Sequence, residues 1–370
     1  MDSNETQNHT QEKEKRLKKL WNGVSVVFAS PIATVGLFIV LFWVFVAIFA
    51  PILTPYTPTE QDWRFTNREP SLTPYAVKDY ERLQHQLERA ESGEEVPSKY
   101  EDLAYISKVE RNYEKADYEY YKNRHPLGTD ELGRDIWARL IYGAQVVLVI
   151  LPMPEKLPDW FPEWIPVPKW IPGGTALWGV FLSLLIGAAL GLLAGYRGGW
   201  MDEVIMRILD AMMSIPLILL YLIIMAALGA SAVNVVLAIA IVGTPGIARL
   251  VRSLALDIKT REYIRAAQTR GEKSAYIMFR EILPNARGPI IIDAMLRVGY
   301  AIFAMGTLGF LGLGMPPPSP DWGSMVAKGR DFILAGSPWQ SLWPALAIAL
   351  LVVGLNLLAD GIREESLKYQ

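Results

Sequence analysis

Residues 175–196 read TALWGVFLSLLIGAALGLLAGY, a run of 22 positions without a charged side chain. A helix rises about 1.5 Å per residue, so this run can cross a hydrocarbon layer about 30 Å thick. The whole chain is 51% hydrophobic and 20% charged, and the two kinds of residue occupy separate tracts. This separation predicts an all-α protein that crosses a membrane several times, and it argues against an ordinary soluble enzyme.

Five further blocks are similar to this one in length and in their lack of charge. The six predicted spans are Pro31–Leu53, Thr175–Tyr196, Ile205–Leu228, Ala232–Val251, Pro289–Leu313 and Leu342–Ala359. A shorter stretch, Ile136–Leu151, carries Arg139 and stops at Pro152. We interpret it as an interfacial helix or as the lead-in to the second span.

Basic residues indicate the orientation of these spans. Nine Lys and Arg residues lie between Arg249 and Arg287, and five lie between Lys13 and Lys19. Both tracts flank spans closely, so the positive-inside rule places both in the cytoplasm. Six spans put both termini on the same side as the central loop, whereas a seventh would separate the two tracts. We therefore expect a multi-pass protein of the cytoplasmic (inner) membrane with both termini in the cytoplasm.

Two tracts between the first two spans then lie outside. In residues 54–135, apolar positions three and four residues apart, from Tyr80 to Leu87 and from Leu103 to Tyr120, predict an amphipathic helical hairpin. Residues 152–174 contain seven prolines and three tryptophans, a composition that excludes a regular helix there.

The composition also excludes several kinds of chemistry. The chain has no cysteine, and its three histidines lie outside every predicted span, which argues against thiol chemistry and a histidine metal site. Gly271–Ser274 lacks the spacing of a phosphate-binding loop. No basic domain of the kind that binds nucleic acid stands out. We expect no catalytic residue, no metal and no cofactor on this chain.

Residues 262–271, EYIRAAQTRG, are the most informative part of the central loop. Ala266 and Ala267 give a short helix a patch of small side chains that another surface can approach closely. Gly271 can end that helix with a positive φ, and Pro284 predicts a break before the next span. Taken alone, such a pattern favours a solvated basic connector.

The whole loop, however, closely resembles the EAA coupling loop of permease subunits of bacterial binding-protein-dependent ABC importers. In that family two alanines and a glycine precede a Leu-Pro pair, and the loop seats in a groove of the cytoplasmic ATPase. Arg265 stands at the family's glutamate position, and Glu281 stands at its isoleucine position. The resemblance implies that the ATPase-coupling residues are Arg265, Ala266, Ala267, Gly271, Leu283 and Pro284.

Other motifs resemble the dipeptide and oligopeptide branch of this family. They are HPLGTDELGRD at 125–135, FLGLG at 310–314, Trp322-Gly323 and NLLADG at 356–361. They occur in the family's order, and the resemblance covers the first span and nearly everything from His125 onward. The charged insert at 60–124 and the Pro/Trp insert at 152–174 lie outside it.

The resemblance implies a type I importer permease fold and a non-catalytic transport subunit. It would move peptides or similar solutes (an oligosaccharide, opine or metal chelate) inward by alternating access. The implied partners are a second permease in a heterodimer, two cytoplasmic ATP-binding subunits, an extracytoplasmic solute-binding protein and the lipid bilayer, with no nucleic acid. The alternative is an ion-coupled secondary transporter, which would need carboxylates or unwound polar helices at the bilayer midplane.

The predicted organisation has five parts. They are a cytoplasmic tail (1–30), the first transmembrane helix (31–53), an extracytoplasmic insert (54–135), the amphipathic and Pro/Trp-rich part (136–174) and a permease core (175–370) whose coupling loop is about 252–288.

The sequence leaves the roles of three further sets of residues open. Asp293 and Arg297, four residues apart in the fifth span, either pair and reach the cytoplasmic interface or line the translocation path or its exit. Asp130 or Asp135 is expected to cap the following helix. The glycines at 187, 191 and 195, and those from 306 to 314, are expected to allow close helix packing.

Overall fold

The computed structural model describes residues 28–62, 65–73, 75–92, 94–100, 102–116, 125–148 and 174–368. In these ranges all regular secondary-structure elements are helices. Two isolated β-bridges join Ser71 to His125 and Thr129 to Asp135. The predicted all-α class is therefore confirmed. The basic N-terminal tract and the Pro/Trp-rich segment lie outside the described residues.

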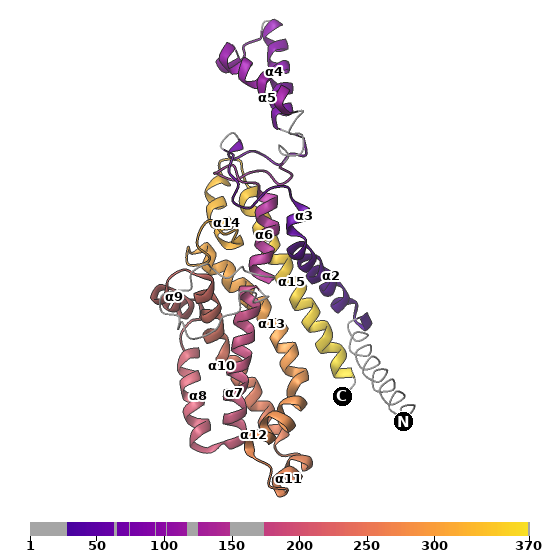
Figure 1. Cartoon of the computed structure of the whole chain (residues 1–370), viewed down its shortest axis with the longest axis vertical. Coiled ribbons are helices and arrows are strands. Elements are labelled where there is room, and N and C mark those ends of the chain that lie inside the picture. Colours follow the sequence, from indigo (N-terminus) through magenta and orange to yellow (C-terminus); the bar gives the residue numbers. More distant parts are fainter. Residues whose placement is uncertain are drawn as a thin grey trace, which may run out of the picture.

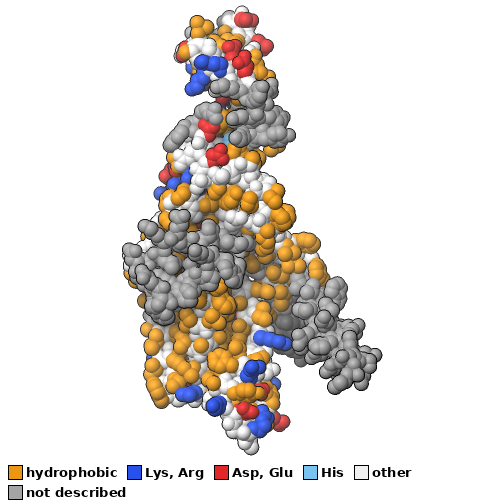
Figure 2. Space-filling view, in the orientation of Figure 1, with side chains coloured by type: hydrophobic (Ala, Val, Ile, Leu, Met, Phe, Trp, Pro, Cys, Tyr) orange, Lys and Arg blue, Asp and Glu red, His pale blue; other side chains and the backbone are white. Residues whose placement is uncertain are grey.

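Five of the described helices are long and apolar enough to cross a membrane. They are α2 (Pro31–Ile48), α7 (Thr175–Arg197), α10 (Ala232–Ile258), α13 (Leu283–Phe310), which continues without a break from Ser274, and α15 (Trp339–Lys368). Figure 2 shows hydrophobic side chains over the middle of the visible face, with many of the charged ones towards its two ends. This distribution is the one expected of a bundle embedded in lipid.

The predicted span Ile205–Leu228 is not one helix. It consists of α8 (Gly199–Met213) and α9 (Leu217–Leu228), which are bent by 91° relative to each other. The bend falls at Pro216, whose ring disfavours the helical conformation of the preceding residue and which has no N–H to donate. The described chain thus has five spans, or six if the bent pair counts as one, and the number six stays a prediction.

Helix α6 (Ile136–Leu148) is too short to cross the membrane alone, since 13 residues rise only about 20 Å. Ten of its residues are buried within the chain, so most of its surface contacts other parts of the protein. Its end lies against the start of α7, where the Thr175 hydroxyl donates to the Val146 carbonyl at 3.0 Å. This placement supports the interpretation of α6 as the lead-in to the second span.

Helices α7 and α10 pack closely through a stripe of glycines on α7. A Cβ at Gly191 would lie 2.5 Å from the Ala248 carbonyl oxygen, and one at Gly195 would lie 2.8 Å from the Ala255 side chain. Gly187 meets α10 in the same way at Ile247. The predicted packing role of these glycines is confirmed.

The two ends of the molecule carry different elements (Figure 1). At one end project α4 (Tyr75–Glu91) and α5 (Leu103–Ala116), joined by η2 (Ser98–Tyr100). At the other end lie α11 (Glu262–Thr269) and α12 (Ser274–Tyr276), and the C-terminal end of α15 points towards that end. Leu83, Tyr100 and Val109 form the small core between α4 and α5.

Short helices complete the end near α4 and α5. These are α3 (Ala50–Leu53), α14 (Trp322–Gly329) and η4 (Arg330–Phe332). The main core includes Trp43 of α2, Ile141 of α6 and Trp322 of α14, all buried. The Trp322 indole donates to the Leu140 carbonyl at 2.9 Å, so α14 is fixed to α6.

Candidate functional site

The predicted coupling helix is α11, and its end is set by Gly271. This glycine has φ 77°, and its N–H bonds to the Gln268 carbonyl at 3.0 Å. The next N–H, from Glu272, reaches back to the Ala267 carbonyl at 3.2 Å. These two bonds satisfy carbonyls that the helix end would otherwise leave free, in the pattern that favours glycine at the left-handed position. The predicted helix stop at Gly271 is confirmed.

The two alanines of α11 serve different surfaces. Ala267 and Ile264 are fully buried in a second core with Ile277 and Ile282, whereas Ala266 and Arg265 are exposed. Ala267 therefore holds α11 against its own chain, and Ala266 is the small side chain that α11 presents outward. The exposed face also carries Tyr263.

The predicted break at Pro284 is wrong, because the helix runs continuously from Ser274 to Phe310. Before the proline, residues Ile277–Ile282 (η3) form a π-helical turn, and the Leu283 N–H bonds to the Met278 carbonyl five residues back. Proline lacks an N–H, and its ring would clash with the carbonyl four residues earlier in an α-helix. The wider turn gives that ring room, so the helix deforms and does not end. Pro284 itself is exposed.

Polar contacts tie the coupling segment to the neighbouring helices. The Lys259 ammonium, just after α10, donates to the Gly195 carbonyl at the end of α7 at 2.9 Å. Arg252 of α10 binds Asp202 of α8 at 2.5 Å. These contacts join the residue after α10 to α7, and α10 to α8.

Asp293 and Arg297 form an ion pair, with 2.5 Å between Arg297 Nε and Asp293 Oδ2. The Arg297 guanidinium also donates to the Gly243 carbonyl of α10 at 3.4 Å and lies against Gly246. Because the helix begins at Ser274, the pair lies midway along it and not near its start. The predicted pairing is confirmed, and the guanidinium also contacts a neighbouring helix, α10.

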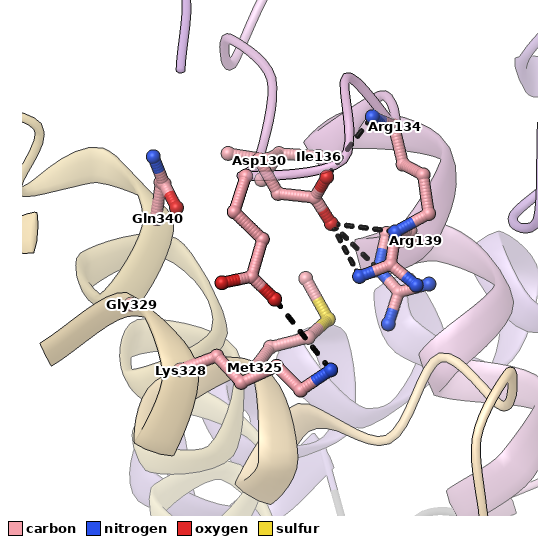
Figure 3. A pocket seen from close by; sticks show the side chains of 9 residues that line it. Asp130, Arg134, Ile136, Arg139, Met325, Lys328, Gly329 and Gln340 are labelled. Carbon is pink, nitrogen blue, oxygen red and sulfur yellow. Dashed lines mark hydrogen bonds and ion pairs between the residues drawn. The ribbon is translucent and has the colours of Figure 1, made fainter. Parts of the chain in front are cut away.

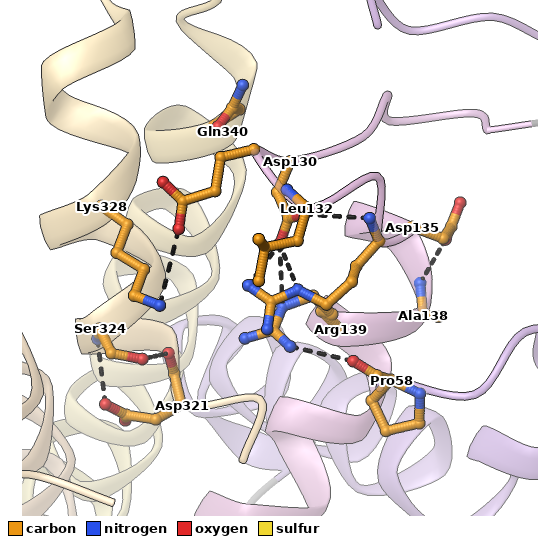
Figure 4. A network of polar contacts seen from close by, with 12 residues as sticks. Pro58, Asp130, Leu132, Asp135, Ala138, Arg139, Asp321, Ser324, Lys328 and Gln340 are labelled. Atoms are coloured by element: carbon orange, nitrogen blue, oxygen red, sulfur yellow. Dashed lines mark hydrogen bonds and ion pairs between the residues drawn. The ribbon is translucent and has the colours of Figure 1, made fainter. Parts of the chain in front are cut away.

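A polar cluster at the opposite end of the molecule includes the turn before α6 (Figure 4). Asp135 caps α6 by accepting from the Ala138 N–H at 2.7 Å. Asp130 instead accepts from the N–H groups of Leu132 and Arg134 and from Arg134 Nε at 2.7 Å. Of the two aspartates predicted as caps, Asp135 has this role, and Asp130 organises the turn.

Arg139 is the centre of this cluster. Its side chain is 4% exposed, and it donates to the carbonyl of Pro58 at 2.9 Å and to that of Ser319 at 3.5 Å. Its Nε lies 3.7 Å from Asp130 Oδ2 and has no hydrogen-bond partner among the described residues. Two guanidinium groups, those of Arg134 and Arg139, thus share the Asp130 carboxylate.

Asp321 caps α14 by accepting from the Ser324 N–H at 3.0 Å. Its burial raises the pKa of the carboxyl from 3.8 to about 6, partly opposed by the hydrogen bonds from Ser324 and Gly323. A Cβ at Gly309 would lie 2.0 Å from this carboxylate, and one at Gly323 would lie 2.2 Å from the Gly306 carbonyl. Gly309 of α13 and Gly323 of the Trp-Gly segment therefore let α13 and α14 meet, which confirms the packing role predicted for Gly309.

Two adjoining pockets share Arg134, Arg139 and Lys328. The smaller holds about 20 Å³ and is bordered by Asp130, Glu131 and Gln340 (Figure 3). The larger holds about 210 Å³, and its lining includes Phe310, Met315, Pro317 and Pro318. Sequence reasoning missed this site. The available signal was Arg139, a lone charge in an apolar helix, but its partners come from distant parts of the chain.

No group of histidine, cysteine, aspartate or glutamate residues in the described part of the chain is arranged to hold a metal ion. The predicted coupling residues and the Asp293–Arg297 pair are also not brought together. The former lie at the end of the molecule, and the latter lies inside the bundle.

Comparison with known proteins gives matches over most of the chain. Residues 187–364 match the family described as "Binding-protein-dependent transport system inner membrane component". Residues 25–74 match "N-terminal TM domain of oligopeptide transport permease C".

Individual relatives extend these matches. The dipeptide transport system permease protein DppC of Alkalihalophilus pseudofirmus is 42% identical over 65% of this chain and 70% of its own length. The di/tripeptide transport system permease protein DppC of Pseudomonas aeruginosa is 34% identical over 89% of this chain and 85% of its own length. The inward-facing MetNI methionine ABC transporter is 18% identical, with a TM-score of 0.42 over 52% of this chain and 91% of that chain.

Proposed function

The chain belongs to the family of binding-protein-dependent transport system inner membrane components, and on that premise we propose that its cargo is a dipeptide or another short peptide. The protein is a multi-pass permease subunit of an ABC importer in the inner membrane. The observation that carries the cargo proposal is the identity of 34% to a di/tripeptide permease over 89% of the chain. Family membership does not support the alternative of an ion-coupled secondary transporter.

As a member of this family, the permease works with an ATPase and a solute-binding protein. The finer proposal is a heterodimer with a second permease, two cytoplasmic ATP-binding subunits and one extracytoplasmic binding protein. In this arrangement the ATP-binding subunits hydrolyse ATP and the present chain supplies no catalytic residue. It supplies the translocation path and the segment that transmits force from the ATP-binding subunits to that path.

That segment is α11 with the π-helical turn that follows it. Arg265 and Ala266 face outward and are placed to contact an ATPase, while Ala267 fixes α11 to the second core. Gly271 sets the end of α11. Leu283 and Pro284 are the first two residues of α13 and directly follow the π-helical turn. Closure of the ATPases pulls on this segment, and α10 and α13 carry the displacement into the membrane, where the bundle alternates between inward-open and outward-open states.

The orientation supports this role. With the basic tract around α11 in the cytoplasm, residues 54–135 and the hairpin α4–α5 lie outside, and both termini lie inside. The insert then stands where a binding protein approaches, and we assign it to the docking surface. Asp293 and Arg297, midway along their helix and 27% and 21% exposed, line the translocation path.

The test is purification of the complex through this subunit, identification of the proteins that accompany it, and measurement of ATP hydrolysis and of uptake into proteoliposomes. A co-purified ATPase, and uptake of dipeptides that depends on ATP, are the expected results. Uptake that continues without ATP, or an assembled complex that lacks an ATPase, would contradict the proposal.

A further inference from the structure

The larger pocket at the end of the molecule opposite α11 combines positive charge with an apolar wall. Arg134, Arg139 and Lys328 line it, and none of the described residues that line it is a carboxylate. Its rim includes Gly312, Pro317 and Pro318, which are exposed. The pocket is therefore open to a ligand that arrives from outside the chain.

The cations are incompletely matched by their own neighbours. Arg134 and Arg139 share one carboxylate, Asp130, and Arg139 Nε keeps no hydrogen-bond partner among the described residues although its side chain is only 4% exposed. Lys328 lies 3.6 Å from Glu131, which is too long for a strong hydrogen bond and leaves its ammonium donors available. A buried cation with an unused donor favours an anionic ligand.

The apolar part of the pocket lining selects among anions. Phe310, Met315 and the prolines at 317 and 318 present apolar surface beside the cations. An inorganic anion gains nothing from such a wall. A carboxylate that carries an apolar side chain on the neighbouring carbon gains from both sides of the pocket.

We propose that this pocket binds the C-terminal residue of a peptide, with its free carboxylate at the cations and its side chain at Phe310 and Met315. The proposal rests on the proposed function, in which the cargo is a short peptide, and it assigns the part of that cargo which the permease recognises.

The experiment measures the binding of two probes to the purified full transporter complex in lipid nanodiscs by titration calorimetry. One probe is the dipeptide Ala-Phe with a free carboxylate, and the other is the same dipeptide with a C-terminal amide. We expect the free acid to bind the wild-type complex at least about tenfold more tightly, as a charge-assisted contact requires. Equal binding of the two probes overturns the proposal.

Variants assign the preference to the pocket. Lys328→Gln should reduce the preference for the free acid to near unity, and Lys328→Arg should restore it. Lys328 is suited to this test because its side chain is 46% exposed, so its replacement spares the fold. Arg207→Gln is the matched control, since it removes an exposed cation of α8 at the other end of the molecule (Figure 1) and should leave the preference unchanged. A preference that persists in Lys328→Gln also overturns the proposal.

A third measurement distinguishes two sources of the bound carboxylate, the peptide cargo and the solute-binding protein. If Lys328→Gln weakens the association of the binding protein while both probes bind equally, the carboxylate belongs to that protein and the cargo proposal is wrong. ATP-driven uptake of the two dipeptides tests the pocket assignment and the proposed import of peptides separately. Equal uptake of both means that peptide import stands and the pocket assignment fails, whereas uptake of neither means that peptide import itself fails.

Discussion

Arg252 of α10 holds Asp202 of α8 through two hydrogen bonds, 2.5 Å from Nε and 2.6 Å from a terminal nitrogen. A second pair, Arg249 with Asp210, joins the same helices. A bidentate contact like that of Arg252 fixes the relative position of two side chains more strongly than a single hydrogen bond does. Because α10 leads directly to α11, these pairs fix α8 to the helix that precedes the proposed ATPase contact.

Replacement of Asp202 by Asn should loosen this connection. We expect a small loss of stability, about 1 kcal/mol because the pair is partly exposed, together with a larger loss of peptide uptake per ATP hydrolysed. Uptake and hydrolysis measured in the same proteoliposomes check this. The swapped pair Asp202→Arg with Arg252→Asp is the control, and coupling that the swap fails to improve over the single variant would show that charge pairing is not the reason.

Gly271→Trp should leave membrane insertion intact and uncouple hydrolysis from uptake. The position has a positive φ, which a side chain disfavours, and no atom of the described residues lies within 4 Å of the place that a Cβ would take. The effect is therefore on the helix end and the surface it presents. Gly336→Trp is the matched control, since that glycine has φ 84° and equal space in a loop far from α11. Normal uptake by Gly271→Trp would contradict the coupling role of α11.

The two alanines of α11 should respond differently to enlargement. Ala267→Phe overpacks the second core and should lower the free energy of unfolding by about 1–3 kcal/mol. Ala266→Phe should change stability by less than about 0.5 kcal/mol, because the site is exposed, but it should reduce the amount of co-purified ATPase. Thermal unfolding and quantitative co-purification measure the two effects. Full ATPase recovery with Ala266→Phe would remove this residue from the contact surface.

Asp293→Asn should leave the Arg297 charge uncompensated between α13 and α10. We expect a loss of about 1–3 kcal/mol in stability and a loss of uptake. The double variant Asp293→Asn with Arg297→Gln should recover the stability, because no unpaired charge remains. If the double variant also recovers full uptake, the pair has a structural role only and does not line the path.

Asp321 predicts a pH dependence of stability. Its folded pKa of about 6 exceeds the usual 3.8, so the folded state binds the proton more strongly and stability falls as the pH rises from about 4 to about 6. The cost above pH 6 is about 2–3 kcal/mol for a shift of this size. Asp321→Asn keeps a capping side chain and should raise the unfolding temperature at pH 7 while flattening this part of the profile. An unchanged profile would show that another group titrates.

The membrane segments could be predicted because each needs a long uncharged run, and such a run consists of consecutive residues in the sequence. The same is true of local signals such as the helix end at Gly271 and the cap at Asp135, whose partners lie within five residues. The bend at Pro216 was visible as a proline, but a proline inside an apolar run permits either a kink or a full change of direction.

The remaining features depend on contacts between distant parts of the chain. The burial of Ala267 requires the position of the π-helical turn, and the role of Arg139 requires Pro58 and Ser319, which are 81 and 180 positions away. No spacing rule relates such residues. For the same reason the sequence alone predicts a helix end at Pro284, since only the surrounding packing shows that the helix widens and continues.

The glycine stripe of α7 has a mechanical consequence. With Gly187, Gly191 and Gly195 seated on α10, the two helices have no layer of long side chains on which to slide or rotate. We expect them to move as one unit during transport. Changes of shape would then fall on the bend before α9 and on the widened turn before Leu283.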